Sequence, residues 1–134
     1  MIPALLLDTH IVVHWLTAPK RLSAEQIRTI RDVVRKRQAL GISAMTLLEI
    51  AVFFSRDSRR GPFDARTVLE KIDSSAIFQI LPITVEVAVE VAALGPYLRD
   101  PADRAIVSTA RVHGLRLVTS DTRIAESRLV PVVV

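Results

Sequence analysis

The chain has 134 residues, of which 50% are hydrophobic, so it is long enough to close one core and its composition excludes general disorder. It contains no cysteine, which excludes disulfides, thiolate zinc sites and a cysteine nucleophile. Its net charge is +4, and 15 of its 18 basic residues are arginine, whose planar guanidinium group matches phosphate. This balance favours a nucleic-acid partner.

The sequence contains no stretch that is typical of a membrane span or a secretory signal. The apolar stretches Ile42–Phe54 and Ile83–Leu94 each contain a glutamate and are shorter than the ~20 residues that a span needs. Met1–Leu7 leads directly into Asp8, without the basic and apolar regions of a signal peptide. We therefore expect a single domain over residues 1–134, located in the cytoplasm and not associated with a membrane.

Short apolar runs alternate with helical patterns along the chain. The first half is predicted to contain a strand at Pro3–Leu7, a helix at His10–Leu16, a Ser23-capped helix to about Gln38, a strand at Leu40–Ser43, and helices at Thr46–Phe54 and Ala65–Ile72. The second half is predicted to contain a strand at Ile77–Leu81, helices at Thr84–Leu94 and Asp103–His113, a strand at Leu115–Thr119, a helix at Thr122–Glu126 and a possible edge strand at Val130–Val134. This alternation predicts right-handed β-α-β units and a mainly parallel sheet between helical layers.

Acidic residues occur where the predicted strands end or the following helices begin. They are Asp8, Glu49, Asp100, Asp103 and Asp121. Each acid taken singly has an ordinary structural interpretation. Thr46 and Glu49 have the spacing of a capping box, and the aspartates stand where they can cap or favour a helix N-terminus.

Taken together, four of these acids indicate a metal site. If the strands are parallel, Asp8, Glu49, Asp103 and Asp121 converge on one edge of the sheet. Carboxylates that lie close together repel one another, and Mg²⁺ or Mn²⁺ relieves that repulsion by binding carboxylate oxygens. Such ions activate water and stabilise the leaving oxygen of a phosphodiester, so an acidic site on a basic chain favours phosphodiester cleavage.

Four segments carry a resemblance to a known family, and they are Leu6–Leu16, Ile42–Ala51, Arg99–Ala110 and Leu117–Asp121. In this order and spacing they resemble the PIN-domain nucleases, and among these the VapC-type toxins of type II toxin–antitoxin pairs. The resemblance runs from about Leu5 to Ile124. It implies a three-layer α/β/α sandwich with a mainly parallel central sheet and Mg²⁺- or Mn²⁺-dependent endoribonuclease activity, with tRNA or rRNA as the substrate class.

The resemblance also assigns roles to particular residues. It implies that Asp8, Glu49, Asp103 and Asp121 are the catalytic and metal-binding acids, that Thr119 supports the site, and that Asp100 is an additional nearby acid. Two positions depart from many relatives, because Leu98 replaces a histidine and Leu48 replaces a tryptophan. Both departures concern substrate contacts and leave the four acids intact.

Several arginines are candidates for contacting phosphate groups. Arg104, beside Asp103, is the best placed, and an ion pair with a neighbouring acid is equally compatible with its position. The face formed by Arg28, Arg31 and Arg35 is interpreted as a solvated helix face rather than an RNA-binding stripe. A further group surrounds the Gly61-Pro62 loop and would either contact phosphates or keep the loop soluble: Arg56, Arg59, Arg60 and Arg66.

The helix predicted at Thr46–Phe54 is apolar nearly all round, which indicates either a partner surface or a helix enclosed by its own domain. The resemblance favours the first, since it implies a homodimer and an antitoxin segment that covers an apolar groove and the acidic site. The alternative function is a non-catalytic PIN-like module that binds RNA or protein. A phosphomonoesterase with Asp8 as nucleophile is disfavoured, because His10 stands where a second aspartate is expected.

Overall fold

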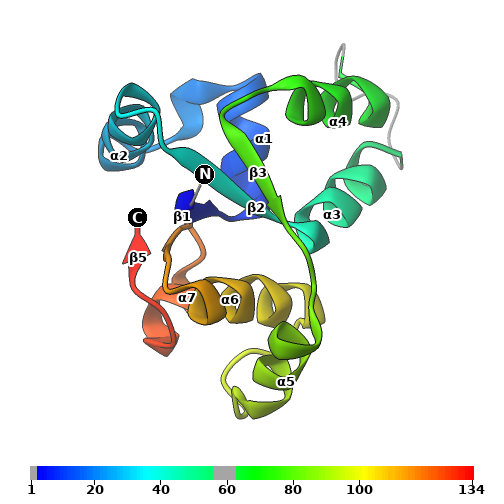
Figure 1. The fold of residues 1–134 in the computed structure, drawn as a ribbon, viewed down its shortest axis with the longest axis vertical. Coiled ribbons are helices and arrows are strands. Elements are labelled where there is room, and N and C mark those ends of the chain that lie inside the picture. The colour runs from blue at the N-terminus through cyan, green and yellow to red at the C-terminus, as the bar shows by residue number, and fades with distance from the viewer. Residues whose placement is uncertain (1–2, 56–62) are drawn as a thin grey trace.

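The computed structural model describes residues 3–55 and 63–134. Within these residues the centre of the molecule is a sheet in the order β3-β2-β1-β4-β5, and every strand pairing is parallel (Figure 1). The strands are β1 (Pro3–Leu7), β2 (Ala39–Ser43), β3 (Phe78–Leu81), β4 (Arg116–Val118) and β5 (Val132–Val133). The prediction of a mainly parallel sheet is therefore confirmed.

Helices cover both faces of the sheet and complete the predicted three-layer α/β/α sandwich (Figure 1). The helices that pack into the core on one face are α1 (Thr9–Thr17), α2 (Ala24–Arg35), α3 (Ala44–Ser55) and α4 (Ala65–Ser74). Those associated with the other face are α5 (Val85–Ala93), α6 (Pro101–His113) and α7 (Thr122–Ser127). A short 3₁₀ turn, Pro19–Arg21, was not predicted and connects α1 to α2.

The two cores result from the alternation of side chains along the buried strands. In β1, Leu5 and Leu7 point into the core under α1–α4, whereas Leu6 points into the core under α6 and α7. In β2, Gly41 leaves the space that this packing needs, since a Cβ atom there would lie 3.0 Å from the Leu5 carbonyl oxygen and 3.3 Å from Leu81 Cδ1. The central strands are thus buried on both faces, as their continuous apolar runs predict.

The helix boundaries differ from the predicted ones by one to three residues, and two of these differences have a clear structural reason. α3 begins at Ala44, immediately after β2, so that Thr46 lies inside the first turn and is buried rather than at the cap position. α2 ends at Arg35 because the chain reverses shortly afterwards through Arg37, whose φ is 58°. No helix of the described part of the chain has the length and apolar character needed to cross a membrane. The Gly61-Pro62 loop, with Arg56, Arg59 and Arg60, lies outside the described residues.

Candidate active site

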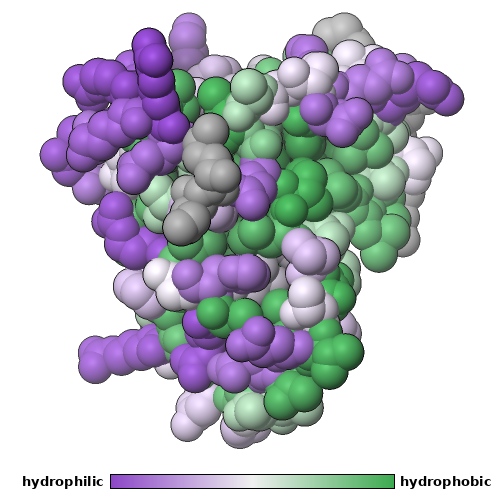
Figure 2. Space-filling view, in the orientation of Figure 1, coloured by the Kyte–Doolittle hydropathy of each residue, from purple (hydrophilic) through white to green (hydrophobic). Residues whose placement is uncertain are grey.

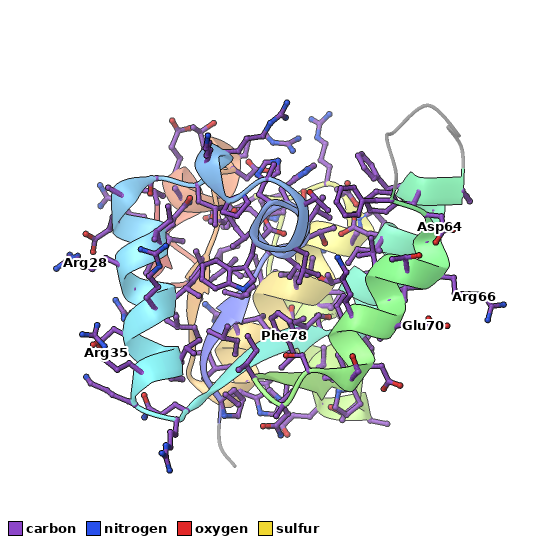
Figure 3. All side chains as sticks on the ribbon, turned by 90° about the horizontal axis from the view of Figure 1, so that it is seen from above. Arg28, Arg35, Asp64, Arg66, Glu70 and Phe78 are labelled. Atoms are coloured by element: carbon purple, nitrogen blue, oxygen red, sulfur yellow. The ribbon has the colours of Figure 1, made fainter. Side chains whose placement is uncertain are left out.

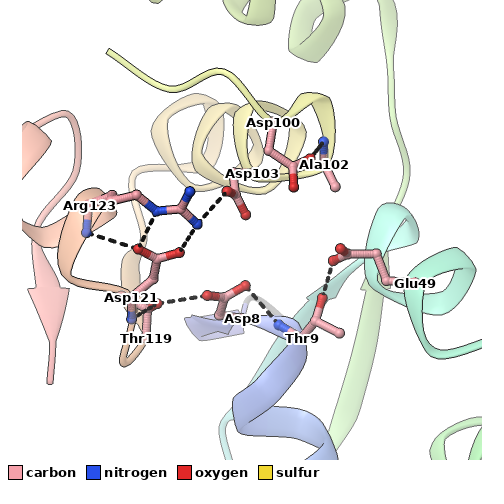
Figure 4. Close-up of polar contacts among 9 residues, drawn as sticks. All are labelled: Asp8, Thr9, Glu49, Asp100, Ala102, Asp103, Thr119, Asp121 and Arg123. Atoms are coloured by element: carbon pink, nitrogen blue, oxygen red, sulfur yellow. Dashed lines mark hydrogen bonds and ion pairs between the residues drawn. The ribbon is translucent and has the colours of Figure 1, made fainter. Parts of the chain in front are cut away.

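The carboxyl ends of the three central strands lie side by side. Leu7 of β1 pairs with Ile42 of β2 and with Val118 of β4, so the residues that follow these strands share one edge of the sheet. This edge is where open parallel sheets bind ligands. Figure 4 shows that the predicted acids face this edge from β1, α3, α6 and the β4–α7 junction.

Asp8 is the most deeply placed of these acids, with 6% of its surface exposed. Its Oδ1 accepts a hydrogen bond from the Thr9 amide at 2.8 Å, and its Oδ2 accepts one from the Thr119 hydroxyl at 2.7 Å. The fully buried Thr119 hydroxyl also accepts a hydrogen bond from the Asp121 amide at 3.1 Å. Thr119 therefore connects two of the predicted ligands, as a supporting residue would.

Three aspartates of this strand edge cap helices, as their positions in the sequence predict. Asp8 caps α1, Asp100 accepts from the Ala102 amide of α6 at 2.8 Å, and Asp121 accepts from the Arg123 amide of α7 at 2.9 Å. Each cap bond uses one carboxylate oxygen of its aspartate. Capping and convergence on one site are thus compatible, because the helices begin at that edge.

Glu49 does not form the predicted capping box, because Thr46 lies inside the helix. Glu49 Oε1 instead accepts a hydrogen bond from the Thr9 hydroxyl at 2.5 Å, and the Thr9 and Thr46 hydroxyl oxygens are 3.1 Å apart. Thr9, the first residue of α1, therefore connects α1 to α3 and orients Glu49. Thr9 was not predicted as a site residue, and its only signal in the sequence is its place beside the first acid.

Asp103, in the first turn of α6, carries the clearest electrostatic sign of a crowded site. Burial and the charges of Asp100, Asp8 and Asp121 raise its pKa from 3.8 to about 6. The pKa of Asp121 is lowered, chiefly because its side chain accepts hydrogen bonds from Arg123. Asp103 therefore lies near enough to Asp8, Asp100 and Asp121 for their charges to repel, as predicted for the aspartates. Glu49 is not among the acids that raise this pKa.

Arg123, which the sequence analysis also missed, is the cation of this site. Its Nη2 lies 3.0 Å from Asp121 Oδ2 and 3.8 Å from Asp103 Oδ2, and Figure 4 shows its guanidinium between the two carboxylates. Arg123 follows Asp121 by two residues, in the first turn of α7. That spacing was visible in the sequence, but only the packing of α7 beside α6 brings Arg123 to Asp103.

Arg104 does not have the environment of a phosphate contact. Its Nη1 donates to the carbonyls of Gly95 and Leu98 at 2.7 and 2.8 Å, and its Nη2 donates to the Val91 carbonyl at 2.6 Å. These bonds use the guanidinium to hold the α5–α6 connection. In the structure the Arg104 guanidinium thus binds backbone carbonyls, where a phosphate or carboxylate contact was expected.

The arginine-bearing face of α2 is solvated, as interpreted from the sequence. Arg28 and Arg35 point away from the body of the protein (Figure 3). Arg28 forms an ion pair with Glu25, and Arg35 forms one with Asp32 at 3.4 Å. Pairing within the same helix accounts for these charges without a ligand.

The donor chemistry of the site fits a hard divalent cation, since every candidate ligand is a carboxylate. Among the described residues, however, no three histidine or acidic side chains lie close enough to hold one ion in this arrangement. The Thr9 hydroxyl donates a hydrogen bond to Glu49 Oε1, and Arg123 lies between Asp103 and Asp121. Binding a shared ion would therefore require these side chains to move.

Comparison with known proteins identifies the class to which this fold and edge site belong. The sequence matches the PIN domain family over residues 5–128, and the chain belongs to that family. It is 31% identical over 124 residues to Ribonuclease VapC22 of Mycobacterium tuberculosis (strain ATCC 25618 / H37Rv), covering 92% of this chain and 91% of that protein. Within the PIN-domain family the chain is of the VapC type, as its four sequence segments predicted.

Solved structures share the fold over nearly the whole chain. VapBC2 from Rickettsia felis, bound to a DNA fragment from its promoter, matches with a TM-score of 0.74 at 17% identity over 98% of this chain and 97% of that one. FitAcB from Neisseria gonorrhoeae matches with a TM-score of 0.69 at 25% identity over 97% and 96% of the chains. VapBC-5 from Mycobacterium tuberculosis, of the VapBC family of toxin–antitoxin systems, matches with a TM-score of 0.65 at 21% identity over 97% of each chain. These likenesses confirm the fold.

Proposed function

We propose that this protein is a Mg²⁺- or Mn²⁺-dependent endoribonuclease and the toxin of a type II toxin–antitoxin pair. The observation that carries this proposal is the crowding of carboxylates at the carboxyl edge of the sheet, expressed in the pKa of about 6 at Asp103. Mutually repelling carboxylates destabilise a protein, and a divalent cation offsets that repulsion. The similarity to a protein named as a ribonuclease supports RNA as the substrate.

In this proposal Asp8, Asp103 and Asp121 hold the metal, and Glu49 either ligates it or orients the attacking water. A bound divalent cation supplies Lewis-acid activation of water and charge stabilisation at the scissile phosphate. Thr119 keeps Asp8 oriented through its hydroxyl, and Thr9 does the same for Glu49. Attack by water in line with the departing 3′-oxygen would leave 5′-phosphate and 3′-hydroxyl ends.

The test is cleavage of a mixed tRNA and rRNA substrate by protein free of antitoxin, in Mg²⁺, Mn²⁺ or EDTA. We expect discrete fragments with 5′-phosphate ends in the metal-containing reactions and none in EDTA. Asp103→Asn keeps the shape of the side chain and removes a charged ligand, so we expect it to lower the rate by about 100-fold or more. Asp73→Asn, at an exposed position of α4, serves as the matched control.

Cleavage by Asp103→Asn at the wild-type rate would show that the assignment of this ligand is wrong. Absence of cleavage by a folded protein that binds Mn²⁺ would instead favour the alternative function, a PIN-like module that binds RNA or protein without cutting it. Fragments that persist in EDTA would indicate a contaminating ribonuclease, which a repeat with Asp103→Asn purified in parallel identifies.

An antitoxin partner is the second part of the proposal. One of the solved structures with this fold, VapBC-5, is by name a member of the VapBC family of toxin–antitoxin systems, which supports an antitoxin partner for this chain. This chain has a groove of about 560 Å³ between α3, α4 and β3, lined by the apolar side chains of Leu47, Leu69, Ile72 and Ile80. Figure 2 shows apolar surface gathered on this side of the molecule, which supports a segment of the antitoxin as the occupant.

A further inference from the structure

The side chain of Arg123 occupies the space between two proposed metal ligands. Its Nε lies 3.3 Å from Asp121 Oδ1 and its Nη2 lies 3.0 Å from Asp121 Oδ2, so the guanidinium binds that carboxylate through both oxygens. The same Nη2 is 3.8 Å from Asp103 Oδ2. One cation thus bridges carboxylates that belong to α6 and to the β4–α7 junction.

This bridge uses the oxygen atoms that a divalent cation would need. Asp121 Oδ1 already accepts the α7 cap bond, and its Oδ2 accepts from the guanidinium. A guanidinium and a divalent cation are both attracted to the same pair of negative charges, but only one of them fits between the carboxylates. Within the described part of the chain, Arg123 is also the one basic residue in ion-pair contact with either carboxylate.

The arginine is held in a way that permits it to leave. Its side chain is 73% exposed, and it lies in the first turn of a short helix rather than in the core. Ion pairs of this exposure contribute little stability. Rotation of the side chain into solvent would therefore free both carboxylates without disturbing the backbone of α7.

We propose that Arg123 is a built-in counter-cation, which neutralises Asp103 and Asp121 in the metal-free protein and which a divalent cation must displace. This inference rests on the proposed function, because it takes the two aspartates as metal ligands. Arg123 would lower the affinity of the site for metal while stabilising the empty protein. It is a positioning residue in this account, since it acts through the two aspartates.

The test compares Mn²⁺ binding by wild type and Arg123→Gln, measured by the electron paramagnetic resonance of free Mn²⁺. We expect Arg123→Gln to bind Mn²⁺ about three- to tenfold more tightly, the range that one or two partly exposed ion pairs supply. Arg123→Lys retains the charge without the bidentate geometry and should fall between the two. Arg99→Gln removes one positive charge from an exposed position beside Asp100 and is the matched control, with less than a twofold effect expected.

A second measurement is thermal unfolding in EDTA. Arg123→Gln should unfold at a lower temperature than Arg99→Gln, because its carboxylates have lost their counter-charge. Added Mn²⁺ should raise the unfolding temperature of Arg123→Gln by more than that of the wild type. The comparison needs no RNA and no cleavage.

The outcomes separate this inference from the proposed function. If the wild type binds Mn²⁺ and a folded Arg123→Gln variant binds it equally tightly or more weakly, the role of Arg123 is overturned and the proposed function is not. Absence of Mn²⁺ binding by the wild type and every variant overturns the metal-dependent function and this inference together. An equal gain in affinity for Arg99→Gln would assign the effect to net charge and would also overturn the inference.

Discussion

At the scale of single residues, the aspartates of the strand edge both cap helices and form the acidic site, two roles that the sequence presents as alternatives. Asp8 gives one oxygen to the Thr9 amide and the other to the Thr119 hydroxyl, and it still lies at the site. Capping bonds favour the ionised carboxylate, whereas burial and neighbouring acids disfavour it. The second effect dominates at Asp103, whose side chain receives no cap bond and faces three other acids.

This balance predicts how stability depends on pH. The pKa of Asp103 in the folded protein, about 6, lies above its usual 3.8. The folded protein therefore holds this proton more strongly than the unfolded chain, so stability falls as the pH rises from about 4 to 6, and the full cost remains above that range. Asp103→Asn removes the ionised carboxylate. In EDTA at about pH 7.5 we expect this variant to be more stable than wild type by on the order of 1 kcal/mol, because solvent screens part of the repulsion.

Urea unfolding between about pH 4 and pH 8 measures this difference, which should vanish at the acidic end. Asp64→Asn is the control, since Asp64 caps α4 and its pKa is lowered by hydrogen bonds from Thr67. Asparagine also caps helices, and removal of a carboxylate with a lowered pKa should give no gain in stability. A gain that is the same at every pH would contradict the electrostatic explanation.

At the scale of elements, the connection between α5 and α6 shows how a residue beside the site supports it indirectly. Arg104 binds carbonyls at the end of α5 and along the connection, at Val91, Gly95 and Leu98. The side chain of Leu98, with 5% of its surface exposed, also packs into the core. The start of α6, and with it the position of Asp103, therefore depends on this arginine.

Substitution of Arg104 should mainly reduce stability. Arg104→Met keeps the apolar stem but leaves the three carbonyls without their donor, and we expect a loss of about 2–4 kcal/mol in urea unfolding. Arg104→Lys keeps the charge but lacks the planar fork, so it should recover only part of that loss. If Arg104→Lys unfolded like wild type while RNA binding fell steeply, the phosphate-contact interpretation would be restored.

At the scale of the whole molecule, apolar side chains remain exposed on two helices. Leu48 and Val52 on α3 are 59% and 40% exposed, and Val85 and Val89 on α5 are 82% and 63% exposed. Exposed apolar clusters of this kind mark interaction surfaces. In Figure 2 this apolar surface contrasts with the strongly hydrophilic end that carries α2.

The homodimer implied by the family resemblance would cover part of this surface. We expect the wild type to sediment as a dimer, and Val89→Glu to weaken dimerisation by about tenfold or more, because a symmetric interface places the substitution on both partners. Val134→Glu, at an exposed apolar position at the end of the chain, is the control and should leave the mass unchanged. A monomeric wild type over the concentration range tested would contradict the prediction.

The sequence by itself determined the order of elements, the parallel sheet and the edge at which Asp8, Glu49, Asp103 and Asp121 meet. These features follow from local patterns: apolar runs of strand length, cap residues and helical periodicity each act within a few neighbouring residues, and parallel strands bring their carboxyl ends together.

The partners of side chains were decided only by the tertiary structure. Thr9 reaches Glu49 across 40 residues, Arg123 reaches Asp103 across 20, and Arg104 binds carbonyls of α5 and of the α5–α6 connection. Such contacts depend on how helices pack against one another. Packing sets the direction of a long side chain, whereas the residues beside it in the sequence do not set that direction.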